Sequence, residues 1–338
     1  MKRIGIICPS EIAFRRFLPA LKESGCFEYA GVAIANKEEF VGATDEILVN
    51  ERAKAQTFVN NYGGKIYEGY SSLIHSTDVD AIYLPLPPGL HYKWAKEALA
   101  ANKHIMVEKP CTTSLATTED LLIDAKEKDL AAHENYMFAF HDQLKAVNGI
   151  VDSGEVGDVR LYRISFGFPM RALNDFRYNN ALGGGALLDC GGYTFKYASL
   201  LLGPTAKMKY AQSNRIAGFN VDMYGSAALV NDEGVTAQVA FGMDNNYKCE
   251  LEVWGSKGTL YTNRILTAPA GFVPEVVIRK SNEEEKRNLP ADDAFKKSIL
   301  HFCHCIEDVN IRENNYQALL RQALLVEDFK RLSGLNVQ

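Results

Sequence analysis

The residues best suited to chemistry are Glu108 and Lys109, which directly follow an apolar run over residues 105–107 and precede Pro110. The run has the length of a buried strand, and a helical pattern begins a few residues later. In open α/β sheets, ligands bind at the carboxyl ends of the strands, so an ammonium group at this position would face a crevice. The alternative interpretation is an ordinary charged turn after a strand.

The turn after the first predicted strand is the second place where a ligand could bind. A dinucleotide fingerprint would place its small residues at Cys8, Ser10 and Ala13, and only the last of these is kept. We expect Cys8, Ser10, Glu11 and Ile12 to line this turn. Because Cys8 and Ser10 carry a Cβ, the backbone should approach a pyrophosphate less closely than glycine would allow, although the Ser10 hydroxyl could contribute a hydrogen bond.

Asn36 and Lys37 follow the second predicted strand, where NAD enzymes usually carry an acidic residue that binds the ribose hydroxyl. A carboxylate would repel a 2′-phosphate, whereas an amide and an ammonium can bind one. This pair therefore favours NADP(H) over NAD(H). The alternative is a solvated turn, since Glu38 and Glu39 follow directly.

Alternating patterns in the first part of the chain predict an α/β fold with a doubly wound parallel sheet of the Rossmann type. Pro19 is expected to kink the first helix, and residues 85–89 (PLPPG) to interrupt regular structure. The predicted strands are 3–8, 29–35, 66–67, 79–84, 104–107 and 131–136, and the predicted helices are 10–24, 52–62, 91–101, 115–129 and 140–153.

The pattern changes from about residue 159. Partly alternating segments at 160–168, 221–230, 235–243 and 248–254 predict a large, mostly antiparallel open sheet in an α+β domain. A helical insertion is expected over 183–202, and helices at 294–309 and 316–332. We place a dinucleotide-binding domain at 1–129 and a substrate-binding and oligomerisation domain at 130–338, with the last helix packing back on the first domain.

Composition narrows the range of partners. The 338 residues carry a net charge of −5 with scattered basic residues, so a nucleic-acid or membrane partner is not expected. No apolar run approaches the roughly 20 residues that span a bilayer, and the start is too short for a secretory signal, so a cytoplasmic location is expected. Seven dispersed cysteines indicate free thiols. Residues 301–305 (HFCHC) are interpreted as a partly buried helix, and no metal site is predicted.

With these motifs established, the chain resembles the Gfo/Idh/MocA family of NAD(P)-dependent oxidoreductases over nearly its whole length. Glu108-Lys109-Pro110 resembles the family's E-K-P motif, and Pro87 with His91 resembles the P-x-x-x-H that precedes it. Residues 183–193 (GGGALLDCGGY) resemble the G-G-G-x-L-x-D-x-G-x-H/Y segment of the substrate domain. The resemblance implies that Pro85, Leu86, Pro87, His91, Glu108 and Lys109 lie at the cofactor.

The resemblance also implies that Lys109, Asp189 and Tyr193 are the catalytic residues, acting beside the nicotinamide and the substrate carbon. Tyr193 stands where many members have His, and Lys196 where a second Asp is common. An alkoxide formed by hydride transfer must be protonated, and a phenol near an ammonium can do this. We therefore expect Tyr193 to relay the proton, Lys109 to tune it and contact substrate, and Asp189 to orient the substrate.

The expected activity is hydride transfer between NAD(P) and a sugar, sugar derivative or polyol. Phe168 and Arg177 are expected to bind the substrate beside Lys109, Asp189 and Tyr193, because aromatic faces suit sugar rings and guanidinium suits phosphate or carboxylate. Two alternatives remain open: a non-catalytic dinucleotide-binding regulator, and a dihydrodiol or dicarbonyl reductase. Family members commonly pair through the outer face of the second-domain sheet, so a homodimer or homotetramer is expected.

Overall fold

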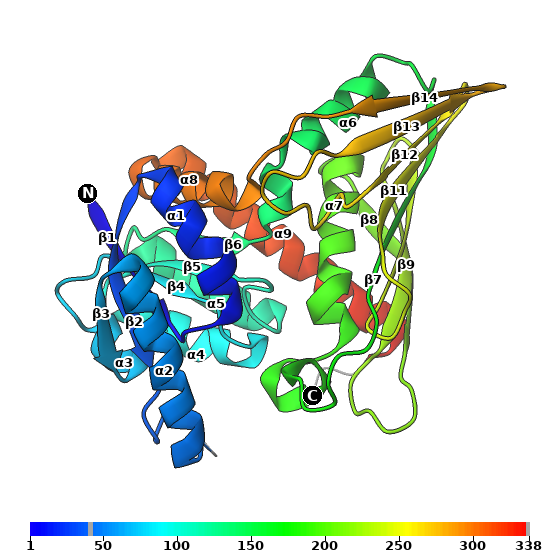
Figure 1. Ribbon diagram of the computed structural model, residues 1–338. Coiled ribbons are helices and arrows are strands. Elements are labelled where there is room, and N and C mark those ends of the chain that lie inside the picture. The colour runs from blue at the N-terminus through cyan, green and yellow to red at the C-terminus, as the bar shows by residue number, and fades with distance from the viewer. Residues whose placement is uncertain (40–42, 336–338) are drawn as a thin grey trace. The chain divides into compact units, whose positions relative to one another are not determined.

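The computed structural model describes residues 1–39 and 43–335. These residues form two compact units (Figure 1). The first contains residues 1–135 and 295–320, and the second contains residues 136–294 and the rest of the chain from 321. No helix among the described residues is long and apolar enough to cross a membrane.

The first unit is built on a parallel sheet with strand order β3-β2-β1-β4-β5-β6, which confirms the predicted Rossmann fold. Its strands are β1 Lys2–Ile7, β2 Phe27–Ile34, β3 Lys65–Glu68, β4 Ala81–Leu84, β5 His104–Glu108 and β6 Ala132–Asn135. Its helices are α1 Leu18–Ser24, α2 Asp45–Tyr62, α3 Tyr70–Ile74, α4 Pro88–Ala100, α5 Leu115–Glu127, most of α8 Ala294–Glu307 and the first half of α9 Val309–Ser333.

Both faces of this sheet are covered. On one face, Tyr83 stacks on Phe17 at a centroid distance of 3.9 Å, and Phe17 in turn contacts Phe295 of α8. On the other face, apolar strand residues form a buried cluster with Trp94 of α4. Because neighbouring residues of a strand point to opposite faces, each apolar run serves both layers.

The second unit contains a sheet with strand order β14-β13-β12-β11-β7-β10-β9-β8, in which β7 and β10 pair in parallel and the other neighbours antiparallel. The prediction of a large, mostly antiparallel sheet is confirmed. The strands are β7 Val159–Gly167, β8 Lys207–Asn214, β9 Tyr224–Val230, β10 Thr236–Gly242, β11 Lys248–Gly255, β12 Thr259–Asn263, β13 Glu275–Lys280 and β14 Glu283–Asn288.

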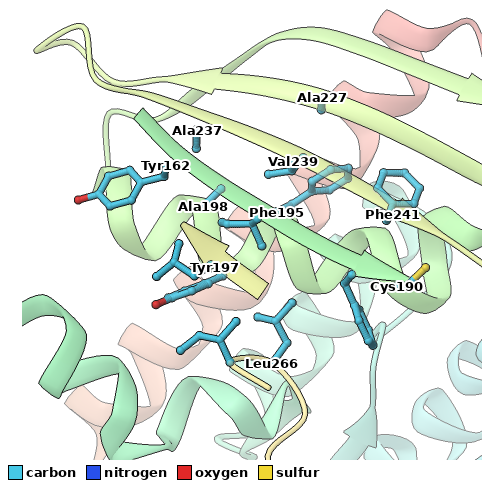
Figure 2. Packing of buried hydrophobic residues seen from close by; sticks show 14 of the residues in the cluster. Tyr162, Cys190, Phe195, Tyr197, Ala198, Ala227, Ala237, Val239, Phe241 and Leu266 are labelled. Carbon is cyan, nitrogen blue, oxygen red and sulfur yellow. The ribbon is translucent and has the colours of Figure 1, made fainter. Parts of the chain in front are cut away.

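The helices of this unit pack on one face of its sheet. They are α6 Asp142–Asp152, α7 Gly192–Leu202 and the second half of α9, with short helical turns at Met137–Phe140, Phe176–Tyr178, Asn180–Leu182 and Leu187–Gly191. Phe195 of α7 contacts Phe241 of β10 at 5.7 Å and Phe329 of α9 at 5.2 Å. Figure 2 shows Phe195 and Phe241 in this core, which holds α7 against the strands.

Several predicted element boundaries were wrong. Helix α4 begins at Pro88, inside the segment expected to be irregular, because proline is tolerated in the first helical turn. Helix α2 begins at Asp45, where the Thr44 hydroxyl accepts a hydrogen bond from the Ile47 N–H. Pro19, expected to kink the first helix, lies in the first turn of α1. A π-helical turn over Ala13–Phe17 directly precedes it and widens the backbone where a proline ring would clash.

Candidate active site

In the turn after β1, a residue other than glycine adopts a backbone conformation that is typical of glycine. Cys8 has φ +75°, in the left-handed region, at the position where the first fingerprint glycine was expected. Its thiol lies 3.8 Å from a Glu51 oxygen, and burial raises the pKa of Cys8 to about 12, so the thiol is protonated at neutral pH. The turn therefore retains the shape of a dinucleotide-binding turn and carries a neutral side chain.

A helix starts directly after this turn, as a pyrophosphate site requires. The Ser10 hydroxyl accepts a hydrogen bond from the Ala13 N–H at 3.3 Å, so it caps the helix. Glu11 is exposed and pairs with Arg15 at 3.2 Å. Ile12 keeps 38% of its surface exposed.

The turn after β2 is held by its own side chains. The Asn36 side-chain oxygen accepts hydrogen bonds from the Glu38 and Glu39 N–H groups at 3.0 and 2.9 Å. The Glu39 carboxylate accepts from the N–H groups of Asn36, Tyr70 and Ser71 at 2.8–3.0 Å. Lys37 is exposed and pairs with Asp45 at 2.6 Å. The Glu39 carboxylate thus faces backbone N–H groups inside the protein, and its negative charge does not repel an anion at Asn36 and Lys37.

His91 holds two loops together. Its ring nitrogens lie 2.7 Å from the Leu86 carbonyl oxygen and 2.8 Å from the Pro110 carbonyl oxygen, and the side chain is fully buried. Burial lowers the pKa of His91 to about 4, while its contacts with the Pro110 and Leu86 carbonyl groups act in the opposite direction. The ring has no exposed surface, so His91 ties the 85–87 loop to the chain after Lys109. That His91 lies at the cofactor stays a prediction.

Glu108 and Lys109 end strand β5, as predicted. The Glu108 carboxylate accepts hydrogen bonds from the Tyr83 hydroxyl at 2.7 Å and the Asn135 amide at 2.6 Å. Removal from water raises the pKa of Glu108, while these two donors and the charge of Lys109 act in the opposite direction. The Glu108 carboxylate is thus engaged by neighbouring strands of its own sheet, and its place at the cofactor stays a prediction. Lys109 is half-buried.

The glycine-rich segment of the second unit packs against Asp222. A Cβ on Gly185, which has φ +115°, would collide with the Asp222 carboxylate. Asp222 accepts a hydrogen bond from the Leu187 N–H at 2.7 Å, and its backbone carbonyl accepts one from the Ala186 N–H at 2.8 Å. Asp222 therefore caps the helical segment that carries Asp189 and Tyr193. Burial raises the pKa of Asp222 to about 6.

Asp189 is bound by the guanidinium of Arg177. The Arg177 Nε donates to an Asp189 oxygen at 2.7 Å, and its Nη1 donates to Asp175 at 3.1 Å. These carboxylates raise the pKa of Arg177 despite its burial. Arg177 was expected to bind a substrate anion; in this structure it orients a predicted catalytic carboxylate.

Tyr193 is held by aromatic rings. Its ring lies 5.0 Å from Tyr136, 5.6 Å from Phe138 and 5.3 Å from Phe166, measured between centroids. The perpendicular contacts with Tyr136 and Phe166 are the favourable edge-to-face type. Phe168, a predicted substrate residue, is half-buried beside Phe166 at 6.1 Å, with the Arg171 guanidinium above its ring. The phenol is therefore fixed in direction.

Sequence reasoning missed three residues that hold predicted site residues within one unit or the other. Asp222 and Glu39 contact backbone N–H groups, and Asp175 shares Arg177 with Asp189. Asp222 lies far along the chain from the helix that it caps, in a segment without a recognisable motif, so nothing local indicated its role. Asp175 was detectable, because it lies two residues before Arg177.

Comparison with known proteins decides the family. Residues 3–136 match the model described as "Oxidoreductase family, NAD-binding Rossmann fold", and residues 144–261 match the Gfo/Idh/MocA C-terminal domain. The chain belongs to this family. The predicted resemblance and the assignment as an NAD(P)-dependent oxidoreductase are confirmed.

The similar proteins include reductases that match along almost their full length. The dTDP-3,4-didehydro-2,6-dideoxy-alpha-D-glucose 3-reductase of Actinomadura kijaniata is 37% identical, over 96% of this chain and 93% of its own. That of Streptomyces violaceoruber is 38% identical, over 98% and 96%. A crystal structure of a 3-ketoreductase from A. kijaniata with NADP and TDP-benzene has a TM-score of 0.89, 36% identity and coverage of 98% and 97%.

A more distant relative is the D-xylose 1-dehydrogenase (NADP(+)) of Haloferax volcanii, 26% identical over 90% of this chain and 88% of its own. These relatives are enzymes that act on sugars or sugar derivatives, so this oxidoreductase is not the silent regulator considered as an alternative.

Proposed function

We propose that this oxidoreductase uses NADPH to reduce a keto group on a sugar carried by a nucleoside diphosphate. The main support is the full-length similarity, at 37% and 38% identity, to enzymes named as reductases of a dTDP-linked keto sugar. Structures of the A. kijaniata enzyme include variants at one lysine and at one tyrosine. These two residues are separated by the same number of positions as Lys109 and Tyr193, which supports the same pair here.

The proposed roles follow from the chemistry of each side chain. Bound NADPH would supply the hydride, which leaves an alkoxide on the sugar. Tyr193, whose ring is fixed by three aromatic contacts, donates the proton to that oxygen. Lys109 provides the positive charge that stabilises the developing oxyanion. Asp189, oriented by Arg177, accepts a hydrogen bond from a substrate hydroxyl.

The test of these roles is turnover of a panel of keto sugars, with and without a nucleoside diphosphate. We expect the Tyr193→Phe and Lys109→Met variants to lose at least about a hundredfold in kcat, since general acid–base groups typically contribute a factor of about 100 to 10,000. Tyr210→Phe, at an exposed phenol, is the matched control. Near-normal kcat for Tyr193→Phe would remove Tyr193 as the proton donor. Reduction of free sugars alone would refute the substrate class.

The preference for NADP(H) rests on the turn after β2. Lys37 is exposed there, and the nearby Glu39 directs its charge toward backbone N–H groups. We expect Lys37→Ala to weaken NADPH binding by roughly tenfold, because one charged contact contributes about 1.5 kcal/mol, and to leave NADH binding unchanged. Lys207→Ala, at another exposed ion-paired lysine, is the control. An equal loss for both nucleotides would contradict a 2′-phosphate site.

We further propose that two copies of this oxidoreductase associate through the face of the second unit's sheet that the helices of that unit leave uncovered. Small residues such as Ser226, Ala228 and Ala240 floor a hollow of about 370 Å³ on this face. The exposed rings of Tyr210 and Trp254 lie on the same sheet. Exposed aromatic residues such as these are enriched at interfaces.

Molar mass from light scattering tests the pairing. Ala240→Arg should convert a dimer or tetramer into a smaller species, because it introduces a charge on the floor of the hollow. Lys248→Arg, a charge-conserving change at an exposed position, should have no effect. An unchanged mass for Ala240→Arg would refute this interface.

A further inference from the structure

A row of polar side chains lies on one face of the first unit's sheet. Met106 of β5 is paired with both Tyr83 and His133, and Glu108 is paired with Asn135. Since side chains alternate along a strand, all of these residues point to the same face. His133 and Asn135 are each about 1% exposed. Polar groups this deeply buried must be satisfied by one another.

Hydrogen bonds connect Glu108 to helix α8. Asn135 donates from its amide nitrogen to Glu108 at 2.6 Å, so its oxygen faces the other way. The Ser298 hydroxyl donates to that oxygen at 2.8 Å. Ser298 has no exposed surface. A hydroxyl has a single proton, so Ser298 can only accept from any further partner.

The further partner of Ser298 is His133, whose Nε2 lies 2.9 Å from the hydroxyl oxygen. Nε2 must therefore carry a proton. The other ring nitrogen, Nδ1, lies 3.1 Å from the Asn315 side-chain oxygen. The Asn315 nitrogen donates to the Ala132 carbonyl at 2.6 Å, which fixes the orientation of that amide. Nδ1 therefore faces an acceptor and must also carry a proton.

An imidazole with protons on both nitrogens is positively charged. A buried charge without compensation would cost several kcal/mol. The compensating charge is the Glu108 carboxylate at the other end of the network. The His133 ring also lies nearly parallel to Phe302, at a centroid distance of 6.1 Å, which suits a cation.

We propose that His133 is a buried imidazolium that keeps Glu108 ionised through Ser298 and Asn135. His133 and Ser298 are then positioning residues for the Glu108-Lys109 segment. Their effect on catalysis rests on the proposed function, whereas the charge of His133 does not. The other titratable groups near His133 are His301 of α8, at a centroid distance of 5.4 Å, and Glu134, the next residue of β6, which accepts from the Cys111 N–H.

The first test is ¹⁵N NMR of histidine-labelled protein at pH 8, with His133 assigned from the His133→Gln variant. We expect two ring N–H signals from His133, which an ordinary histidine would not show at this pH because its pKa is about 6.5. His104 is an internal comparison with one ring N–H, because its Nδ1 accepts a hydrogen bond from the Ala131 N–H at 3.0 Å and therefore carries no proton. One ring N–H on His133 in the wild-type protein would overturn the proposal, whatever the enzyme turns over.

The second test breaks the network between its two ends. Ser298→Ala removes the hydroxyl, and we expect His133 to lose one ring proton and the acid limb of the kcat/KM profile to move to higher pH. Ser298→Thr, which keeps the hydroxyl, should restore both. Ser24→Ala is the control, because the Ser24 hydroxyl bonds its near neighbours in the chain, Leu21 and Cys26, and lies outside the network. A profile that does not move while His133 loses its proton would overturn the positioning role.

Discussion

Asp222 allows a quantitative prediction of how stability depends on pH. Its carboxylate is 5% exposed and caps the helical segment that carries Asp189 and Tyr193. Burial raises its pKa from 3.8 to about 6, while the Leu187 N–H and the charges of Arg215 and Lys330 act in the opposite direction. Because the folded pKa is raised, the folded state binds the proton more tightly than the unfolded chain.

The sign and size of the change in stability with pH follow from the difference between the folded and unfolded pKa values of Asp222. The stabilisation from protonation is complete below pH 3.8 and is lost as the pH rises through about 6. A shift of this size corresponds to roughly 3 kcal/mol, of which about 2 kcal/mol should be lost between pH 4.5 and 7. Asp222→Asn removes the titration. The free energy of unfolding of the wild type, relative to this variant, should therefore fall by about 2 kcal/mol over that range.

Urea unfolding followed by circular dichroism at several pH values measures this difference. Asp244→Asn is the control, because Asp244 is an exposed aspartate of the same unit. Its difference from the wild type should be independent of pH. A constant difference for Asp222→Asn, or one that grows with pH, would refute the argument that burial dominates at Asp222.

Two further predictions concern the same segment. Gly185→Ala should destabilise the protein by about 3 kcal/mol in chemical unfolding, since it adds strain at φ +115° and a collision with Asp222. Gly218→Ala is the control: Gly218 also has a positive φ but lies in open space, so the loss of stability should be clearly smaller. Equal losses of stability for the two variants would contradict the collision. Arg177→Lys should lower kcat by roughly tenfold or more, because lysine cannot match the guanidinium contact with Asp189. The midpoint of unfolding should stay unchanged. An unchanged kcat would contradict the orienting role of Arg177.

The parallel sheet was predictable because its signal is local. Strands β1, β2, β4 and β5 each contain an apolar run, and the run that ends at Glu108 was found to within a residue. Several strands of the second unit were missed. Strand β14, Glu283–Asn288, has the sequence EEEKRN and lies at an edge of the second sheet. Edge strands often carry charges that prevent further pairing, so its composition resembles a loop.

Helix starts were missed where capping residues, and not apolar periodicity, determine them. Helix α9 begins at Val309, well before the predicted start, because the Asp308 carboxylate accepts hydrogen bonds from the Asn310 and Ile311 N–H groups. The first turns of this helix are polar and show no apolar stripe. A capping side chain is a single residue, and its signal is weaker than that of a repeated pattern.

The glycine-rich segment explains why a motif can indicate a site without showing how the site is held. A Cβ at Gly184 would collide with the Arg177 carbonyl, one at Gly185 with Asp222, and one at Gly192 with the Tyr136 hydroxyl. Each missing Cβ makes room for a group elsewhere in the chain, and that group also holds Asp189 or Tyr193 in place. The sequence shows only that these positions lack a Cβ. Tertiary packing determines which group occupies the space beside each glycine. The motif therefore predicts where the catalytic residues lie, and the fold determines which residues support them.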